Sequence, residues 1–212
     1  MLVGSFNPTI FQPQWFARQN LLSQAEADAA KILVLVPQIC DFETERFRVQ
    51  VTTERFAAFS KPDTNPVPLR DLVLGTFFIL EHTPVTAIGL NRHMHFQLET
   101  VEQWHALGDK LAPKEPWRSI LKTGRPGMRV LVIEGMMDGS DGSDDPLGPK
   151  LTVKVEPSVQ VKHGAFFEIN EHYPAAKNDA MKSIMETLKT RWEDAYNYAA
   201  EISDYILRWA AS

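Results

Sequence analysis

Alternating hydrophobic and polar positions in the middle of the chain predict its longest strand. From Thr86 to Leu98 the even-numbered positions are mostly apolar, whereas the odd-numbered positions become polar towards the end of the stretch. A period of two is typical of a strand that packs one face on a core and leaves the other face open. We expect the open face to carry Asn91, His93, His95 and Gln97.

Shorter patterns predict the other elements. The predicted strands cover residues 6–12, 32–39, 46–52, 55–60, 128–135, 151–157 and 161–170, and the predicted helices cover residues 13–22, 23–30, 69–80, 100–112 and 114–121. Residues 32–39 (ILVLVPQI) are mostly apolar, so we expect a largely buried strand that stops or bulges at Pro37. Residues 128–135 (MRVLVIEG) are apolar on both faces, which is typical of a strand in the centre of a sheet.

The last part of the chain predicts one long helix over residues 179–209. Apolar residues recur there at seven-residue steps from Met181 to Trp209. At 1.5 Å per residue this helix would be ~45 Å long, so it either crosses the whole sheet or projects towards a partner. The aromatic residues that could contact such a partner are Trp192, Tyr198, Tyr205 and Trp209.

The order of these elements suggests an internal duplication. A strand, a helix, three strands and a helix occur twice, over residues 1–82 and over residues 83–212. A short match supports the repeat, with Gln14, Trp15, Ala17 and Leu22 corresponding to Gln103, Trp104, Ala106 and Leu111. Four identities also arise by chance, so duplication and coincidence both stay open.

The predicted fold class is α+β, with an antiparallel sheet, helices on one face and a long C-terminal helix, in one compact domain overall. Two βαβββα units joined edge to edge resemble, in outline, the saddle of the TATA-binding protein. None of the intercalating or minor-groove residues of that protein can be placed on this chain. The resemblance therefore implies a fold pattern and no function.

Composition narrows the functional classes. Hydrophobic residues make up 44% and charged residues 23%, as in soluble globular domains, and the net charge of −5 gives no overall attraction for nucleic acid or an anionic membrane. The first residues lack signal-peptide features and no apolar run reaches ~18 residues, so we expect a cytoplasmic protein without membrane contact. The single cysteine, Cys40, excludes an internal disulfide, and we expect it to be a small buried thiol.

The histidines are the only residues whose spacing suggests a metal. His93 and His95 form an HxH pair that could reach one metal ion, and His105 on the next helix could be a third ligand. The apolar face of the strand should attract that helix instead, which would place His105 on the other side. We therefore expect no metal and no other cofactor, and histidines that face solvent or a partner.

No sequence motif identifies a reaction. The nucleotide-binding, zinc-protease and nucleophile-elbow motifs are all missing from the sequence. One acidic loop lacks the alternating spacing of a calcium site, so we expect a solvated loop around Asp138, Asp141, Asp144 and Asp145.

The remaining candidate site is the polar side of the predicted sheet. We call this surface the polar face and define it by Arg46, Arg48, Gln50, Asn91, His93, His95, Gln97 and Lys154. One interpretation is a sheet face that only contacts water, which is common in antiparallel sheets. The other is a modestly basic recognition face for a protein segment or for nucleic acid.

Three stretches of the chain resemble an uncharacterised, sporadically distributed family of bacterial proteins. They are residues 49–59 (VQVTTERFAAF), 80–91 (LEHTPVTAIGLN) and 107–117 (LGDKLAPKEPW). The resemblance implies a soluble prokaryotic protein and supplies no catalytic residues.

The sequence favours a non-enzymatic protein-interaction module. It would act as an adaptor, an inhibitor or a regulatory subunit, for example in a bacterial defence or toxin-control operon, and could self-associate through its long helix. Two alternatives stay open. One is nucleic-acid binding over the polar face, and the other is a metal-dependent hydrolase at His93, His95 and His105.

Overall fold

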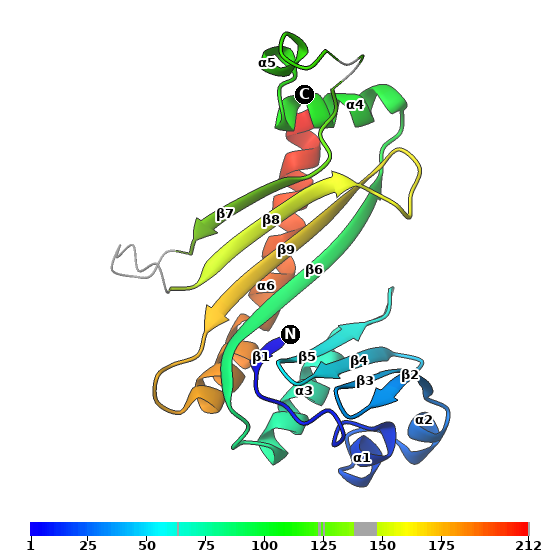
Figure 1. Cartoon of the computed structure of the whole chain (residues 1–212), viewed down its shortest axis with the longest axis vertical. Coiled ribbons are helices and arrows are strands. Elements are labelled where there is room, and N and C mark those ends of the chain that lie inside the picture. The colour runs from blue at the N-terminus through cyan, green and yellow to red at the C-terminus, as the bar shows by residue number, and fades with distance from the viewer. Residues whose placement is uncertain (63, 123, 125, 138–147, 212) are drawn as a thin grey trace. The chain divides into compact units, whose positions relative to one another are not determined.

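A computed structural model of the chain confirms the α+β class (Figure 1). It describes residues 1–62, 64–122, 124, 126–137 and 148–211. Within these ranges there are six helices and one antiparallel nine-stranded sheet with the strand order β2-β3-β4-β5-β1-β6-β9-β8-β7. The long final helix is present, as predicted.

The elements have the following bounds. The strands are β1 (Leu2–Gly4), β2 (Lys31–Val36), β3 (Ile39–Glu43), β4 (Phe47–Thr52), β5 (Arg55–Ser60), β6 (Val85–Gln97), β7 (Leu131–Met136), β8 (Lys150–Pro157) and β9 (Gly164–Pro174). The helices are α1 (Pro13–Arg18), α2 (Gln24–Asp28), α3 (Val67–Ile79), α4 (Val101–Leu111), α5 (Glu115–Arg118) and α6 (Ala180–Ala211). The chain forms two compact units, one of residues 1–90 and 173–192 and the other of residues 91–172 and 193–212.

Phenylalanine side chains build the core of the first unit. Phe56 of β5 is fully buried, and its ring lies 5.0 Å from Phe77 of α3 and 5.3 Å from Phe11. The sequence places α3 closely against its neighbours because Gly75 has no side chain. A Cβ there would lie 2.5 Å from the Leu21 side chain, so glycine permits this close packing.

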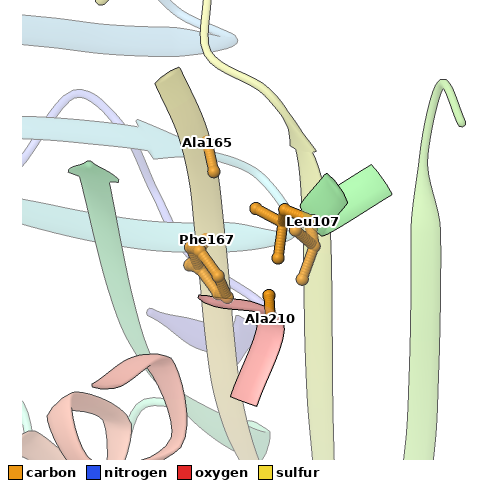
Figure 2. Packing of buried hydrophobic residues seen from close by; sticks show 5 residues of the cluster. Leu107, Ala165, Phe167 and Ala210 are labelled. Carbon is orange, nitrogen blue, oxygen red and sulfur yellow. The ribbon is translucent and has the colours of Figure 1, made fainter. Parts of the chain in front are cut away.

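The core of the second unit lies between β6, β8, β9 and two helices. Leu107 of α4 packs with Val155, Ala165 and Phe167 of the sheet and with Ala210 of α6 (Figure 2). The predicted alternation along β6 is confirmed in this unit. Its even-numbered positions Met94 and Phe96 pack against this cluster, as does Leu98 just beyond the strand, and its odd-numbered positions face the other way.

The structure corrects two predictions at the start of the chain. Residues 6–12 do not form a strand, since the first strand is β1 and residues 8–10 form a turn. The apolar run 32–39 contains a strand, β2, that stops before Pro37 as predicted, but the strand is not buried and belongs to a hairpin in which Pro37 and Gln38 form the turn between β2 and β3. All six residues of β2 are exposed, because β2 is the outermost strand on this side of the sheet.

The third correction concerns the run 128–135, which we expected at the centre of the sheet. The corresponding strand, β7, is the outermost strand on the other side. Alternation and composition report which faces of a strand are apolar, but they do not report how many neighbours the strand has.

Helix α6 agrees closely with its predicted bounds, but its seven-residue repeat does not mark one buried stripe. Met181 and Leu188 are buried, whereas Trp209 is exposed. A straight α-helix drifts by ~20° per seven residues, so four steps rotate Trp209 by roughly 80° away from Met181. Small residues, including Ala199, Ser203 and Ala210, occupy the buried side at this end of the helix.

The predicted division at residues 82 and 83 rests on duplication, which a strand order does not test, and it stays a prediction. Four strands, and not the predicted three, follow the first helices, because the hairpin of β2 and β3 replaces one strand. Among the described residues, no helix combines the length and the apolar character needed to cross a membrane.

Two neighbouring phenylalanines test the core of the first unit. We expect Phe77→Ala to lower the free energy of unfolding by about 3–5 kcal/mol, because it removes a buried ring that contacts three others. Phe78→Ala is the matched control, since Phe78 is 81% exposed, and should change it by less than about 0.5 kcal/mol. Urea unfolding at equilibrium measures the free energy of unfolding of both variants. Equal effects of Phe77→Ala and Phe78→Ala would contradict the placement of Phe77 in this core.

Candidate functional site

The part of the polar face in the first unit is held together by a carboxylate that the sequence did not single out. Asp41 of β3 lies directly opposite Gln50 of β4. Arg48 donates two hydrogen bonds to the Asp41 carboxylate, from Nε at 3.0 Å and from Nη2 at 2.8 Å, and Gln50 Nε2 donates a third at 2.7 Å. Two predicted binding residues are therefore bound to a neighbour in their own sheet.

This arrangement stabilises the charged form of Asp41. The side-chain hydrogen bond from Arg48 holds the pKa of the Asp41 carboxyl below its ordinary value of 3.8, and the bond from Gln50 acts in the same direction. Burial of the carboxyl opposes this shift, because Asp41 is only 3% exposed.

The third predicted residue of this unit is paired as well. Arg46 precedes β4 and makes a two-pronged contact with Glu26 of α2, with Nη2 at 2.8 Å from Oε2 and Nε at 3.2 Å from Oε1. Its guanidinium also lies over the Phe47 ring, 4.8 Å from the ring centre. The hydrogen bond to Glu26 raises the pKa of Arg46.

In the second unit, His95 and His93 gather around an aromatic ring. Phe166 of β9 lies 4.7 Å from the His95 ring and 5.6 Å from the His93 ring. His95 Nδ1 is 2.8 Å from Ser158 Oγ in the turn after β8, and His93 Nε2 is 3.6 Å from Glu168. These two predicted residues do lie together, with partners that the sequence did not indicate.

Lys154 of β8 joins the same group of side chains. Its Nζ donates to Glu156 at 3.0 Å, lies 3.6 Å from Glu168 and lies 5.7 Å from the centre of the Phe166 ring. The hydrogen bond to Glu156 is the main reason why the pKa of Lys154 is raised. The other two predicted residues of this unit, Asn91 and Gln97, are exposed on β6.

These contacts change the electrostatic character of the polar face. Arg46, Arg48 and Lys154 each lie beside a carboxylate of the same unit. Binding to a nucleic-acid backbone depends on cations that are available to neutralise phosphates. The polar face therefore offers hydrogen-bonding groups with little excess positive charge.

The third histidine of the predicted metal site lies elsewhere. His105 is on α4, whose Leu107 packs into the cluster on the apolar side of the sheet, while His93 and His95 are on the polar side. Within the described ranges, no group of three His, Cys, Asp or Glu side chains is arranged to hold a metal ion. The acidic residues Asp141, Asp144 and Asp145, together with Asp138, lie outside the described residues.

His105 instead lines a cavity of about 720 Å³ in the second unit. This volume falls in the range of small-molecule sites, and Leu107, Met128 and Val155 give it an apolar floor. Its Lys114 and Asp109 are ion-paired with each other, and its Glu156 is bound to Lys154. Three of the four charged side chains that line the cavity are thus paired within the protein, and the fourth is Arg118.

The aromatic residues predicted on α6 differ in their surroundings. Lys110 Nζ lies 5.6 Å from the centre of a Trp209 ring and donates to the Trp209 carbonyl. Tyr198 and Tyr205 are exposed, and their side chains make no hydrogen bond or ring contact within the described part of the chain. Trp192 is only partly exposed. The neighbouring Tyr196, which the sequence did not single out, stacks on the Arg92 guanidinium at 3.9 Å.

The outermost strands are the surfaces that sequence reasoning missed. In β2, five consecutive apolar residues are exposed, from Ile32 to Val36. In and next to β7 the exposed apolar residues are Val130, Val132, Ile133 and Met136. Outer strands of natural sheets are usually protected by charges, prolines or covering elements, so exposed apolar edge strands are unusual. The signal in the sequence is their composition, which by itself favours burial and does not report an edge position.

Cys40 is not a reactive group. The thiol is buried and donates to the Phe11 carbonyl, with Sγ 3.0 Å from the oxygen. Burial, together with the charge of Asp41, raises the pKa of Cys40 to about 11. The prediction of a small buried thiol is confirmed.

Comparison with known proteins finds no matching family model, no matching curated protein and no matching solved structure.

The Asp41 contacts predict a specific pH dependence. We expect Asp41→Asn to lower the free energy of unfolding at pH 7 by about 1–3 kcal/mol, because it removes charge-assisted hydrogen bonds. The folded-state pKa lies below 3.8, so the contribution of Asp41 is complete above about pH 4 and is lost as the pH falls through the folded-state pKa. The difference between wild type and variant should therefore shrink below pH 4 in urea unfolding.

Asp71→Asn is the control for this experiment, since Asp71 forms an exposed ion pair with Arg70 and should contribute less than about 1 kcal/mol. A wild-type to Asp41→Asn difference that stays constant from pH 7 to pH 2 would contradict the assignment.

The burial and raised pKa of Cys40 predict that its thiol reacts slowly with disulfide reagents. With a buried thiol and a pKa of about 11, the native protein at pH 8 should react with a chromogenic disulfide reagent only as fast as it unfolds. The Val159→Cys variant provides the control, because Val159 is 97% exposed and its replacement should react at once. Immediate reaction of one thiol per wild-type chain would show that Cys40 is accessible.

Proposed function

We propose that the chain is a protein-interaction module, acting as an adaptor, an inhibitor or a regulatory subunit, and that β7 accepts an extended segment of a partner protein. One observation carries this proposal. Among the described strands β7 pairs only with β8, yet it is apolar on both faces.

Strand addition fits the chemistry of β7. An edge strand offers a row of backbone donors and acceptors, and side chains on alternate positions select the residues of the added strand. Val132 and Met136 lie on the same face as Lys154 and Lys150, whereas Ile133 shares the other face with Val153. We therefore expect a partner segment that is apolar at successive positions.

Regular geometry also supports addition at β7. Its pairing with β8 is continuous over all six residues, from Leu131 opposite Val155 to Met136 opposite Lys150. A strand without a bulge on its paired side keeps the backbone N–H and C=O groups of its free side in the regular pattern that an added strand needs. The charge within β7, Glu134, is bound to Lys150 at 3.1 Å and is less available to repel an added strand.

A protein fits this unit better than nucleic acid as the partner. Lys154 and Lys150 near this edge are both paired with glutamates, which removes the excess positive charge that phosphate binding needs. Tyr198 and Tyr205 add exposed aromatic side chains to the same unit, and tyrosine is enriched in protein interfaces.

Capture from the native host tests the proposal. We expect a protein that is retained by the immobilised wild-type chain and is lost with Val132→Lys and with Ile133→Lys, because a lysine in an edge strand opposes the addition of another strand. Mass spectrometry identifies the retained proteins, and nuclease treatment shows whether nucleic acid is also bound.

Val159→Lys is the matched control. It makes the same substitution at an exposed valine in a turn of the same unit and should retain the partner. Far-UV circular dichroism establishes that the variants are folded. The same proteins on all four baits, or nucleic acid without protein, would overturn the proposal.

A further inference from the structure

The other outermost strand of the sheet, β2, supports an independent inference. We propose that β2 pairs with β2 of a second copy of this chain, antiparallel and around a twofold axis near Val34 and Leu35. The inference does not depend on what binds at β7, because it rests on residues of the first unit.

The starting observation is a conflict between the composition of β2 and its position. A strand that is apolar at five consecutive positions is typical of the interior of a sheet, with neighbours on both sides. Among the described strands, β2 has one neighbour, β3, and its apolar residues are exposed on both faces. Ile32 lies opposite the buried Phe42, whereas Val34 lies opposite Asp41 on the polar side. A further strand beside β2 would resolve the conflict on both faces at once.

The distribution of charge favours an identical strand as that neighbour. Lys31 is the only charged residue of β2, and it is the first residue of the strand. In an antiparallel pair centred on Val34, the two Lys31 side chains would lie at opposite ends, roughly 20 Å apart. Leu33 of one copy would then face Leu35 of the other. No like charges meet, and the single charge of β2 lies at its end, away from the apolar stretch that would pair.

Symmetry explains why such an assembly would stop at two chains. A twofold contact uses the β2 edge of both copies and leaves no free β2 behind. A contact between β2 of one copy and β7 of the next would instead leave a free edge at each end and build filaments.

The geometry of β2 also sets the expected strength. The register between β2 and β3 shifts between Ile32 and Val34, which marks a bulge, and Pro37 follows the strand directly. A bulge and a proline shorten the stretch that can pair regularly. A single short strand buries less than the ~800 Å² per partner of a standard interface, so we expect a weak, concentration-dependent dimer.

Sedimentation velocity between about 1 and 500 μM tests the dimer. We expect the wild-type chain to pass from monomer to dimer over this range, and Val34→Lys to weaken dimerisation at least tenfold. Val67→Lys is the matched control, because Val67 of the same unit has the same exposure as Val34, 39%, and lies on α3. It should dimerise as the wild type does. Urea unfolding establishes that all three proteins are folded.

A cysteine at the proposed axis tests the pairing directly. Opposed residues of an antiparallel pair have Cα atoms about 4.5–5.5 Å apart, a distance that a disulfide can bridge. Under oxidised glutathione, Val34→Cys or Leu35→Cys, whichever lies on the axis, should form a cross-linked dimer, while Val159→Cys should not. The buried Cys40 does not compete.

A wild-type chain that is monomeric at every concentration would overturn the inference, as would Val34→Lys dimerising like the wild type. Higher oligomers that grow with concentration would instead indicate contacts between β2 and β7. The first two results leave the β7-dependent capture of a partner unaffected, so the two proposals can fail separately.

Discussion

An open β-sheet always ends in two strands that have a neighbour on one side only, and this constraint governs the chemistry of the present fold. Backbone donors and acceptors on the free side must find water or another chain. Here the two end strands, β2 and β7, also carry apolar residues on both faces. Water can hydrogen-bond to their backbone groups, but it leaves their apolar side chains exposed. An added strand would therefore change the exposure of these two strands most.

The side chains of the polar face satisfy one another to a degree that limits what they can recognise. Three carboxylates, those of Asp41, Glu26 and Glu156, each hold a cation of the same unit. Such pairs fix side-chain conformations and reduce the charge available for outside ligands. The charged side chains of the polar face thus have partners within the protein, whereas the edge strands β2 and β7 still expose apolar side chains and have a neighbour on one side only.

Local patterns were enough to predict much of this fold. The strand β6 is predicted because one of its faces is apolar and the other is polar, and α6 is predicted from a periodicity sustained from Met181 to Trp209. The hairpin of β2 and β3 was not, because its turn, Pro37 and Gln38, has none of the glycine or asparagine typical of two-residue turns. An apolar run with a single proline is then indistinguishable from one bulged strand.

The candidate site was harder to predict, because it depends on register. Asp41 meets Arg48 and Gln50 only through the alignment of β3 with β4, and Phe166 meets His95 only through the placement of β9 beside β6. Neither alignment leaves a signal within a single stretch of sequence. The edge positions of β2 and β7 are likewise set by the whole strand order and not by their own residues.

The placement of β1 has a consequence for the order of folding. Leu2 pairs with Phe56 on one side and with Ile88 on the other, whereas the hairpins from β2 to β5 join residues that are close in sequence. Local hairpins form early and distant pairings form late, because closing a long loop costs more chain entropy. During synthesis β1 is already present when β5 emerges, but β1 cannot be held from both sides until Ile88 has left the ribosome.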